Sequence, residues 1–246
     1  MNKLFKTILF HDSFCTMHTR CQWHSCPQAQ SEKAARFSFA PKRSHELALM
    51  PTGQHLKGTM DEGLIMKPMS EDSFEMDVHV DSDFLGLHGK EDQADPDNVR
   101  SRAGCVILLN KCPIIWSSHL QSSISTSAMM AEYYALSAAM REVLPLRALV
   151  RTVAAGCGIN TRCLTTFRTT VWEDNAGAWT LANLDPGQTA PRSRFCDSKV
   201  HWFRSRLKPK QIEVKKIDTK LQLADLCTKA LVKDIFVYLR KLLMGW

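Results

Sequence analysis

Four acidic residues lie at positions that exposure to solvent alone does not explain. Asp81 ends a segment in which apolar and polar residues alternate, and Asp174 lies where a short apolar strand turns into a helix. Glu132 belongs to the apolar stripe of a long helical pattern. Asp225 lies between two apolar residues near the start of a later helical pattern. Carboxylates at the ends of strands and helices are candidates for shared chemistry.

The chemistry that suits such a set is metal binding. Burying several carboxylates without partners is costly, so a buried group of them normally holds cations. Oxygen ligands favour Mg²⁺, or Mn²⁺, over Zn²⁺. A pair of ions held by carboxylates is the arrangement used for in-line displacement at a phosphodiester. Spacing alone also allows the simpler interpretation, in which each carboxylate is partly exposed or paired.

The charge of the chain is distributed unevenly along its 246 residues. The net charge is +7, but residues 61–99 carry −10 and residues 192–246 carry +9. This asymmetry suits a protein that gathers carboxylates in one place and binds a polyanion in another. Two solvated surfaces of opposite sign would explain it equally well.

Composition narrows the class of protein. With 44% hydrophobic residues the chain can bury one substantial core, and no apolar run reaches the roughly 18 residues of a membrane span. The nine cysteines occur without a recognisable secretory signal. They indicate free thiols in a reducing compartment, so we expect an intracellular protein, cytoplasmic or nuclear, and not a secreted one.

Periodicity predicts a mixed α/β domain from about residue 70 to the end. The predicted strands are 74–81, 105–110, 113–117, 171–172 and 212–217. One long helix is predicted to begin at Ser127. Further helices are predicted over 176–184, 197–207, 220–231 and the region from Ile235 to Leu242. We expect Pro145 to bend or end the long helix and Pro51 to interrupt an earlier one. Thr219 and Gln222 form a capping-box pattern ahead of the predicted helix 220–231.

Several strings occur in the order found in one family. Residues 81–246 resemble the RNase H domain that ends the Pol polyprotein of copia-type LTR retrotransposons. The matching strings are VDSDF (80–84), SRAGCV (101–106), PIIWSS (113–118), AEYYAL (131–136), EDN (173–175), QLADLCTKAL (222–231) and LMGW (243–246). ARFSFAPKRSHE (35–46) and HLKGT (55–59) resemble the stretch that joins reverse transcriptase to RNase H. The string around Asp225 favours RNase H over integrases, which also use carboxylates.

The resemblance implies an RNase H-like five-stranded mixed sheet flanked by helices, and cleavage of the RNA strand of RNA–DNA hybrids. By motif match, the resemblance makes Asp81, Glu132, Asp174 and Asp225 the catalytic and metal-binding residues, with two Mg²⁺ ions, or Mn²⁺. Asp81 would bridge both ions, Glu132 and Asp174 would hold the ion at the leaving oxygen, and Asp225 would hold the ion that activates water. Phosphate contacts are expected from four lysines, for which an ordinary solvated edge is the alternative: Lys208, Lys210, Lys215 and Lys216.

The resemblance also divides the chain. Residues 1–34 are unmatched and expected to be disordered, 35–69 are a remnant of the reverse transcriptase connection, and 70–246 form the RNase H-like domain. Met130 stands where the family usually has an acidic residue, so the capping box that this residue would form with Ser127 is expected to be lost, at a cost of about 1 kcal/mol. Phe195 replaces the usual His of the family. The expected partners are an RNA–DNA hybrid and, in an intact polyprotein, the reverse transcriptase part.

Two other functions compete with a nuclease. The departures from the family pattern favour an inactive retroelement remnant that at most binds nucleic acid. The N-terminal segment offers a third, a zinc-binding module, because imidazole and thiolate ligands cluster there. Those residues are His11, Cys15, His18, Cys21, His24 and Cys26. Their irregular order, without a Cys-x-x-Cys pair, favours disorder over a zinc site.

Overall fold

A computed structural model of the chain describes residues 43–68, 74–85, 96–158, 167–188, 190, 193 and 198–245. These residues divide into two compact units. The larger unit lies within Met66–Thr228, and the smaller is formed by parts of Met1–Ile65 and Lys229–Trp246. The predicted disorder and the alternative zinc module of residues 1–34 lie outside the described residues, and so does Phe195.

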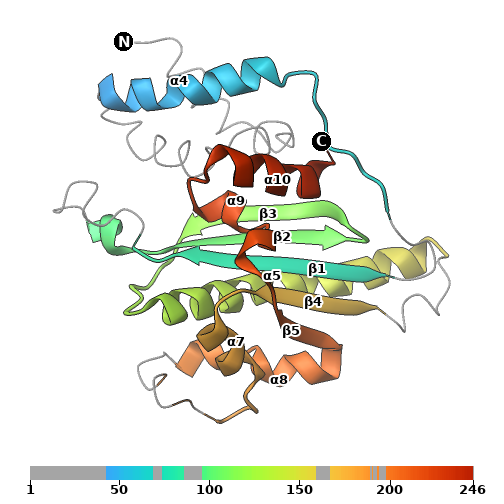
Figure 1. Cartoon of the computed structure of the whole chain (residues 1–246). Coiled ribbons are helices and arrows are strands. Elements are labelled where there is room, and N and C mark those ends of the chain that lie inside the picture. Colours follow the sequence, from blue (N-terminus) through green and yellow to red (C-terminus); the bar gives the residue numbers. More distant parts are fainter. Residues whose placement is uncertain are drawn as a thin grey trace. The chain divides into compact units, whose positions relative to one another are not determined.

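The larger unit is built on a five-stranded sheet (Figure 1). Its strands are β1 (Glu75–Asp83), β2 (Arg102–Leu109), β3 (Cys112–Leu120), β4 (Arg168–Glu173) and β5 (Ile212–Lys216). The strand order is β3-β2-β1-β4-β5, with β1, β2 and β3 antiparallel and β4 parallel to both of its neighbours. The five-stranded mixed sheet flanked by helices that the sequence predicts is therefore confirmed.

The alternation in β1 assigns its side chains to two faces of the sheet. Met76, Val78 and Val80 are buried in the main hydrophobic core. Asp77 and His79 point to the opposite face, as does Asp81, and all three are buried there as well. The central strand therefore carries an apolar side toward the core and a polar side whose residues need partners.

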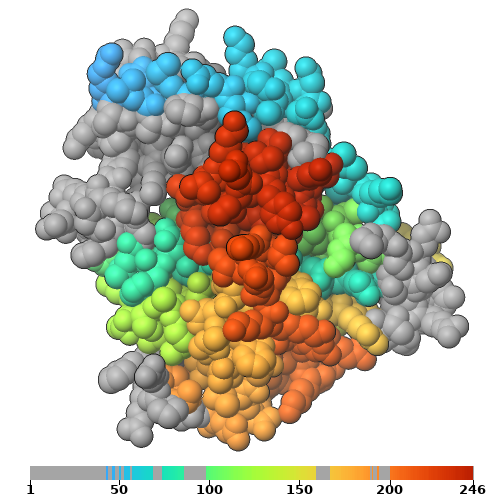
Figure 2. Space-filling view, viewed as in Figure 1, coloured from blue at the N-terminus to red at the C-terminus, as the bar shows by residue number. Residues whose placement is uncertain are grey.

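Helices cover the two faces of the sheet unequally. The long helix α5 (Ala128–Gly156) packs on the core face together with α7 (Ala176–Asn183) and α8 (Arg204–Leu207). The short helix α9 (Asp225–Thr228) packs on the other face, against Gly104 of β2. The approach is so close that a side chain at Gly104 would collide with Thr228 and Cys227. Helix α9 contacts β1, β2 and β3, and Figure 2, viewed as Figure 1, shows orange-coloured residues between β5 and α9 at the surface in the middle of this face.

The described residues of the larger unit also form 3₁₀ turns, and those of the smaller unit include two helices. The turns are η1 (Pro96–Val99), η3 (Ser198–His201), η4 (Lys208–Lys210) and η5 (Thr219–Leu221). The smaller unit contains α4 (Arg43–Gly58) and α10 (Lys233–Met244), which are joined by an edge-on contact between His55 and Phe236. No described helix combines the length and the apolar composition needed to cross a bilayer.

Several predictions about helices are wrong. Helix α5 does not end at Pro145, and α4 is not interrupted at Pro51. In the described part of the predicted helix 197–207, the structure has η3 and the four-residue α8 instead. In α5 the buried side chains on both sides of Pro145 supply tertiary packing that outweighs one lost backbone hydrogen bond. The predicted helix 220–231 is instead η5 followed by the short α9, because Gln222 is fully buried against the sheet and does not form the predicted capping box.

Candidate metal site

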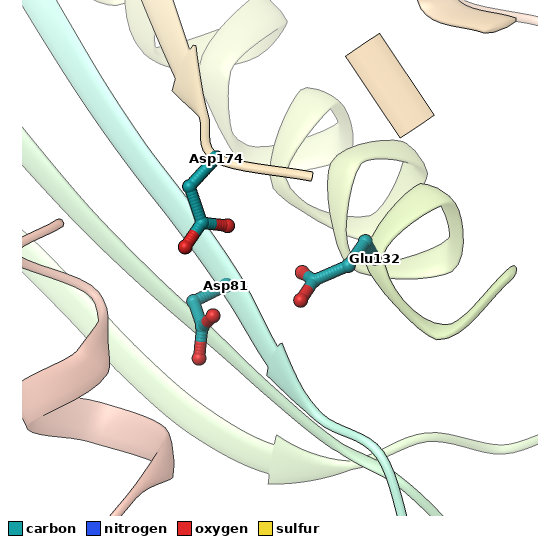
Figure 3. A group of neighbouring side chains, drawn as sticks. All are labelled: Asp81, Glu132 and Asp174. Atoms are coloured by element: carbon teal, nitrogen blue, oxygen red, sulfur yellow. The ribbon is translucent and has the colours of Figure 1, made fainter. Parts of the chain in front are cut away.

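Three of the four predicted carboxylates come together at one end of the sheet (Figure 3). Asp81 lies near the end of β1, Asp174 directly follows β4, and Glu132 is close to the N-terminus of α5. Each offers a carboxylate oxygen, and these three atoms all lie within 4.8 Å of one another. Hard oxygen donors at this separation can share a divalent cation such as Mg²⁺ or Mn²⁺.

Strand register explains why the two aspartates meet. The parallel ladder between β1 and β4 pairs Glu75 with Arg168 and ends at His79 and Trp172. Asp81 and Asp174 each lie two residues beyond that last pair, at matching positions along their strands. Because carboxyl ends of parallel strands lie at the same edge of a sheet, the register itself brings the two side chains together.

Helix capping fixes the third carboxylate. The hydroxyl of Ser127 accepts a hydrogen bond from the Met130 backbone N–H at 3.2 Å, which starts α5 just ahead of Glu132. Half of the capping box therefore survives although Met130 replaces the acidic residue. The partial positive charge at the N-terminus of this long helix favours the nearby carboxylates.

Burial sets the electrostatics of the site. Asp81 is fully buried, Glu132 is 7% exposed and Asp174 is half-buried. Two hydroxyls hold the aspartates in place: Thr228 donates to Oδ2 of Asp81, and Thr219 donates to Oδ2 of Asp174 at 2.8 Å. Like charges this close repel each other strongly in a buried site, so a cation between them would be strongly favoured.

The fourth predicted residue, Asp225, is not a member of this three-residue group. It begins α9 and is buried, with Thr228 one turn further along the same helix. Since Thr228 donates to Asp81, α9 is attached to the site through that residue. A role for Asp225 in metal binding stays a prediction.

Sequence reasoning missed the residues that support the carboxylates. Gln222 donates through Nε2 to the Val80 carbonyl at 2.9 Å and to the Trp172 carbonyl at 3.3 Å. Its Oε1 lies 3.2 Å from Nδ1 of His79, whose pKa burial lowers to about 4, so the ring is neutral. Only the unusual string around Asp225 pointed here, and its Gln was interpreted as a helix cap.

The four predicted phosphate-binding lysines lie together on β5 and on the turn before it. All four are exposed, and two of them form surface ion pairs: Lys208 with Asp185 and Lys215 with Glu213, each at 2.9 Å. Exposed pairs of this kind contribute little energy, so they can open to meet a phosphate. Their role in nucleic-acid binding stays a prediction.

The fold and site define a class of protein: a mixed α/β domain that gathers carboxylates at the end of its central strands. No family model matches the chain. It is 25% identical over 204 residues to the retrovirus-related Pol polyprotein from transposon RE1 of Arabidopsis thaliana, covering 83% of this chain. It is 24% identical over 208 residues to the Pol polyprotein from transposon TNT 1-94 of Nicotiana tabacum, covering 85% of this chain.

The chain is thus similar over most of its length to retrovirus-related Pol polyproteins from plant transposons, and the predicted resemblance is confirmed. It spans 13% of the length of the RE1 polyprotein and 14% of the TNT 1-94 polyprotein. Among solved structures, it is similar to the N-terminal RNase H domain of a Mycobacterium tuberculosis protein fused to maltose-binding protein. That match has 12% identity and a TM-score of 0.36, and covers 69% of this chain and 98% of that one.

Proposed function

We propose that this domain is a metal-dependent endonuclease that cleaves the RNA strand of RNA–DNA hybrids. The observation that carries the proposal is the convergence of Asp81, Glu132 and Asp174 at the end of the sheet. Burying such a group of carboxylates is costly unless a cation balances their charge. Metal ions held in this way are suited to phosphodiester chemistry. Relatedness to Pol polyproteins supports a nucleic-acid substrate of this kind.

The donor set fits Mg²⁺, with Mn²⁺ as an alternative, because every ligand is a carboxylate oxygen. Asp81, Glu132 and Asp174 would hold the metal, and Asp225 would contribute to a second ion. When bound, the ions supply Lewis acidity and a more acidic water. The Thr228 and Thr219 hydroxyls orient the two aspartates before the metal arrives.

The proposed substrate is a duplex recognised by its shape and backbone. Contacts to 2′-hydroxyls across the wide minor groove would distinguish the RNA strand, and the four lysines would position the duplex through its phosphates. In a longer polyprotein, the reverse transcriptase part would be the partner that supplies the hybrid. The four described cysteines form no disulfide, which supports an intracellular location.

Cleavage of an end-labelled RNA–DNA hybrid by the full chain in Mg²⁺ tests the proposal. We expect the RNA strand to be cut at internal positions, and Asp174→Asn to lower the rate by about a hundredfold or more, since a metal ligand is lost while the shape is kept. Asp61→Asn is the matched control, because Asp61 is an exposed aspartate of the smaller unit. This control should cut at the rate of the unmodified chain.

The alternatives have distinct outcomes. A folded chain that binds the hybrid but never cuts it, in Mg²⁺ or Mn²⁺, is the inactive remnant. Cutting that Asp174→Asn does not affect would place the activity elsewhere or in a contaminant, and the carboxylate site would lose its assignment.

A further inference from the structure

The two central strands part at the site, and one side chain fills the gap between them. Strand β1 stays paired with β2 as far as Asp83, and β4 stays paired with β5 as far as Glu173. The ladder between β1 and β4 ends earlier, at His79 and Trp172. Beyond that pair the strands form a fork, and Asp81 and Asp174 lie at its two tips.

Gln222 occupies the base of the fork. Its Nε2 donates to the carbonyls of Val80 on one strand and Trp172 on the other, so one amide group bridges both strands where their own ladder stops. Gln222 is 0% exposed, and a buried amide with partners on both strands has little freedom to move. The spacing of the fork therefore depends on this side chain.

The same residue anchors the segment that follows it. Oε1 of Gln222 lies 3.2 Å from Nδ1 of His79 and accepts from the Ala224 backbone N–H at 3.4 Å. At the other end of the segment, Thr228 donates to Asp81. Residues 222–228 are thus fastened to β1 at both ends, with Asp225 between the two attachments.

We propose that Gln222 is a positioning residue that sets the separation of Asp81 and Asp174 and the placement of Asp225. This inference rests on the proposed function and deepens it. Gln222 itself holds no metal. Its effect on chemistry is exerted through the carboxylates, in the manner of an outer residue that orients metal ligands.

Gln222→Met tests the proposal, because methionine keeps the length and approximate volume of the side chain but cannot donate to either carbonyl. The expected result is that half-saturation by Mg²⁺ rises and kcat on the hybrid falls, each by about tenfold, with KM for the hybrid unchanged. Trp179→Phe is the matched control: it also removes a donor to a strand carbonyl, that of Val214 at 3.1 Å, but away from the fork.

A merely structural role makes a different prediction. If Gln222 only stabilises the fold, Gln222→Met and Trp179→Phe will both lower the melting temperature and leave the Mg²⁺ dependence of the folded enzyme unchanged. That result overturns the positioning role while hybrid cleavage by the unmodified chain still supports the proposed function.

A measurement on the unmodified chain tests whether the Gln222 side chain is held between the two strands. It needs neither a folded variant nor a chain that cleaves the hybrid. Hydrogen exchange followed by NMR should show the Nε2 protons of Gln222 protected to the same degree as the amides of β1. Exchange as fast as in an exposed glutamine would overturn the inference, whether or not the chain cuts RNA. Protection in a chain that neither binds Mg²⁺ nor cuts would support the anchor and reject the proposed function.

Discussion

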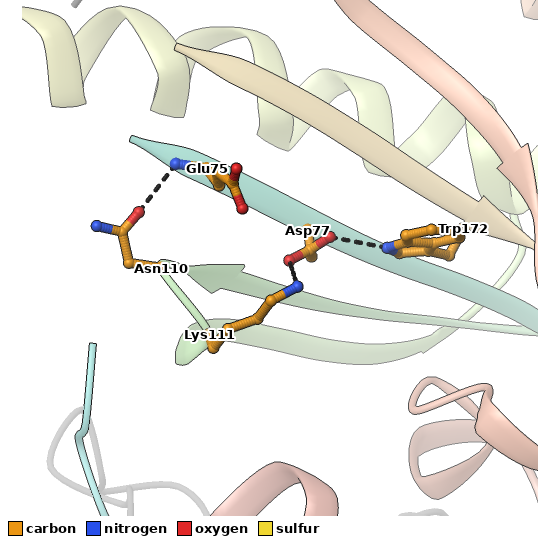
Figure 4. A network of polar contacts seen from close by, with 5 residues as sticks. All are labelled: Glu75, Asp77, Asn110, Lys111 and Trp172. Carbon is orange, nitrogen blue, oxygen red and sulfur yellow. Dashed lines mark hydrogen bonds and ion pairs between the residues drawn. The ribbon is translucent and has the colours of Figure 1, made fainter. Parts of the chain in front are cut away.

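Asp77 and Asp81 are the same residue type on the same face of the same strand, yet their side chains have opposite electrostatic surroundings. Asp77 is neutralised: its Oδ2 lies 2.6 Å from Nζ of Lys111 and its Oδ1 accepts from the Trp172 indole at 2.9 Å (Figure 4). Asp81 is brought together with two further carboxylates. The first environment neutralises a charge, and the second concentrates charge of one sign.

The difference comes from the neighbouring elements and not from β1. Lys111 is supplied by the tight turn between β2 and β3, where Asn110 and Lys111 both have positive φ, at 48° and 67°. Asn110 also accepts from the Glu75 backbone N–H at 2.9 Å, which holds this turn against the start of β1. At the other end of β1, the neighbouring elements supply Glu132 and Asp174. A buried carboxylate is structural where its neighbours are cations and donors, and is a candidate ligand where they are other carboxylates.

The largest expected effect is on catalysis. Asp81→Asn should lower hybrid cleavage in Mg²⁺ by about a thousandfold, because the fully buried ligand at the centre of the group is lost. Asp77→Asn should retain the rate within about threefold, since Asp77 contacts no member of the group. Single-turnover cleavage of a labelled hybrid measures both. Equal losses in the two variants would break the distinction between the two aspartates.

The next effect is on binding of the cation. Mg²⁺ at about a hundred times its dissociation constant should raise the free energy of unfolding of the unmodified chain by about 3 kcal/mol. Asp77→Asn should show the same gain and Asp81→Asn almost none. Denaturant unfolding followed by circular dichroism, with and without Mg²⁺, gives these values. A gain that survives in Asp81→Asn would mean that the ion binds elsewhere.

The smallest effect distinguishes the two environments without any metal. In a chelator, Asp81→Asn should raise the free energy of unfolding by about 1 kcal/mol, because one charge leaves a repulsive group. Asp77→Asn should lower it by a similar amount, about 1 kcal/mol, since its partner Lys111 is partly exposed and solvent screens the pair. Destabilisation of equal size in both variants would contradict the repulsion inferred for the site.

Local patterns in the sequence were sufficient to predict several elements and the positions of three carboxylates that lie together in the structure. The alternation of β1, the start of α5 at Ser127 and the apolar segment before Asp174 each depend on neighbours in the chain, and each is found in the structure. Prolines were less informative. Pro145 and Pro51 both lie inside helices. At Pro145, the buried residues on either side outweigh the local preference.

The supporting residues could not be predicted in this way, since their partners are distant in the chain. Thr219 and Gln222 have the spacing of a capping box, but Thr219 bonds Asp174 and Gln222 bonds carbonyls of β1 and β4. A side chain that can satisfy a local backbone group can equally satisfy a distant one, and burial decides between them.

The sequence by itself determined the residue types of the site and the positions along the chain of the strands that carry them. Only the tertiary structure decided which aspartate is neutralised and which joins the group. That choice depends on register and on the parting of β1 from β4, and these follow from long-range pairing and packing. Local periodicity places a side chain on a face of the sheet, but the partner that it meets there comes from another part of the chain.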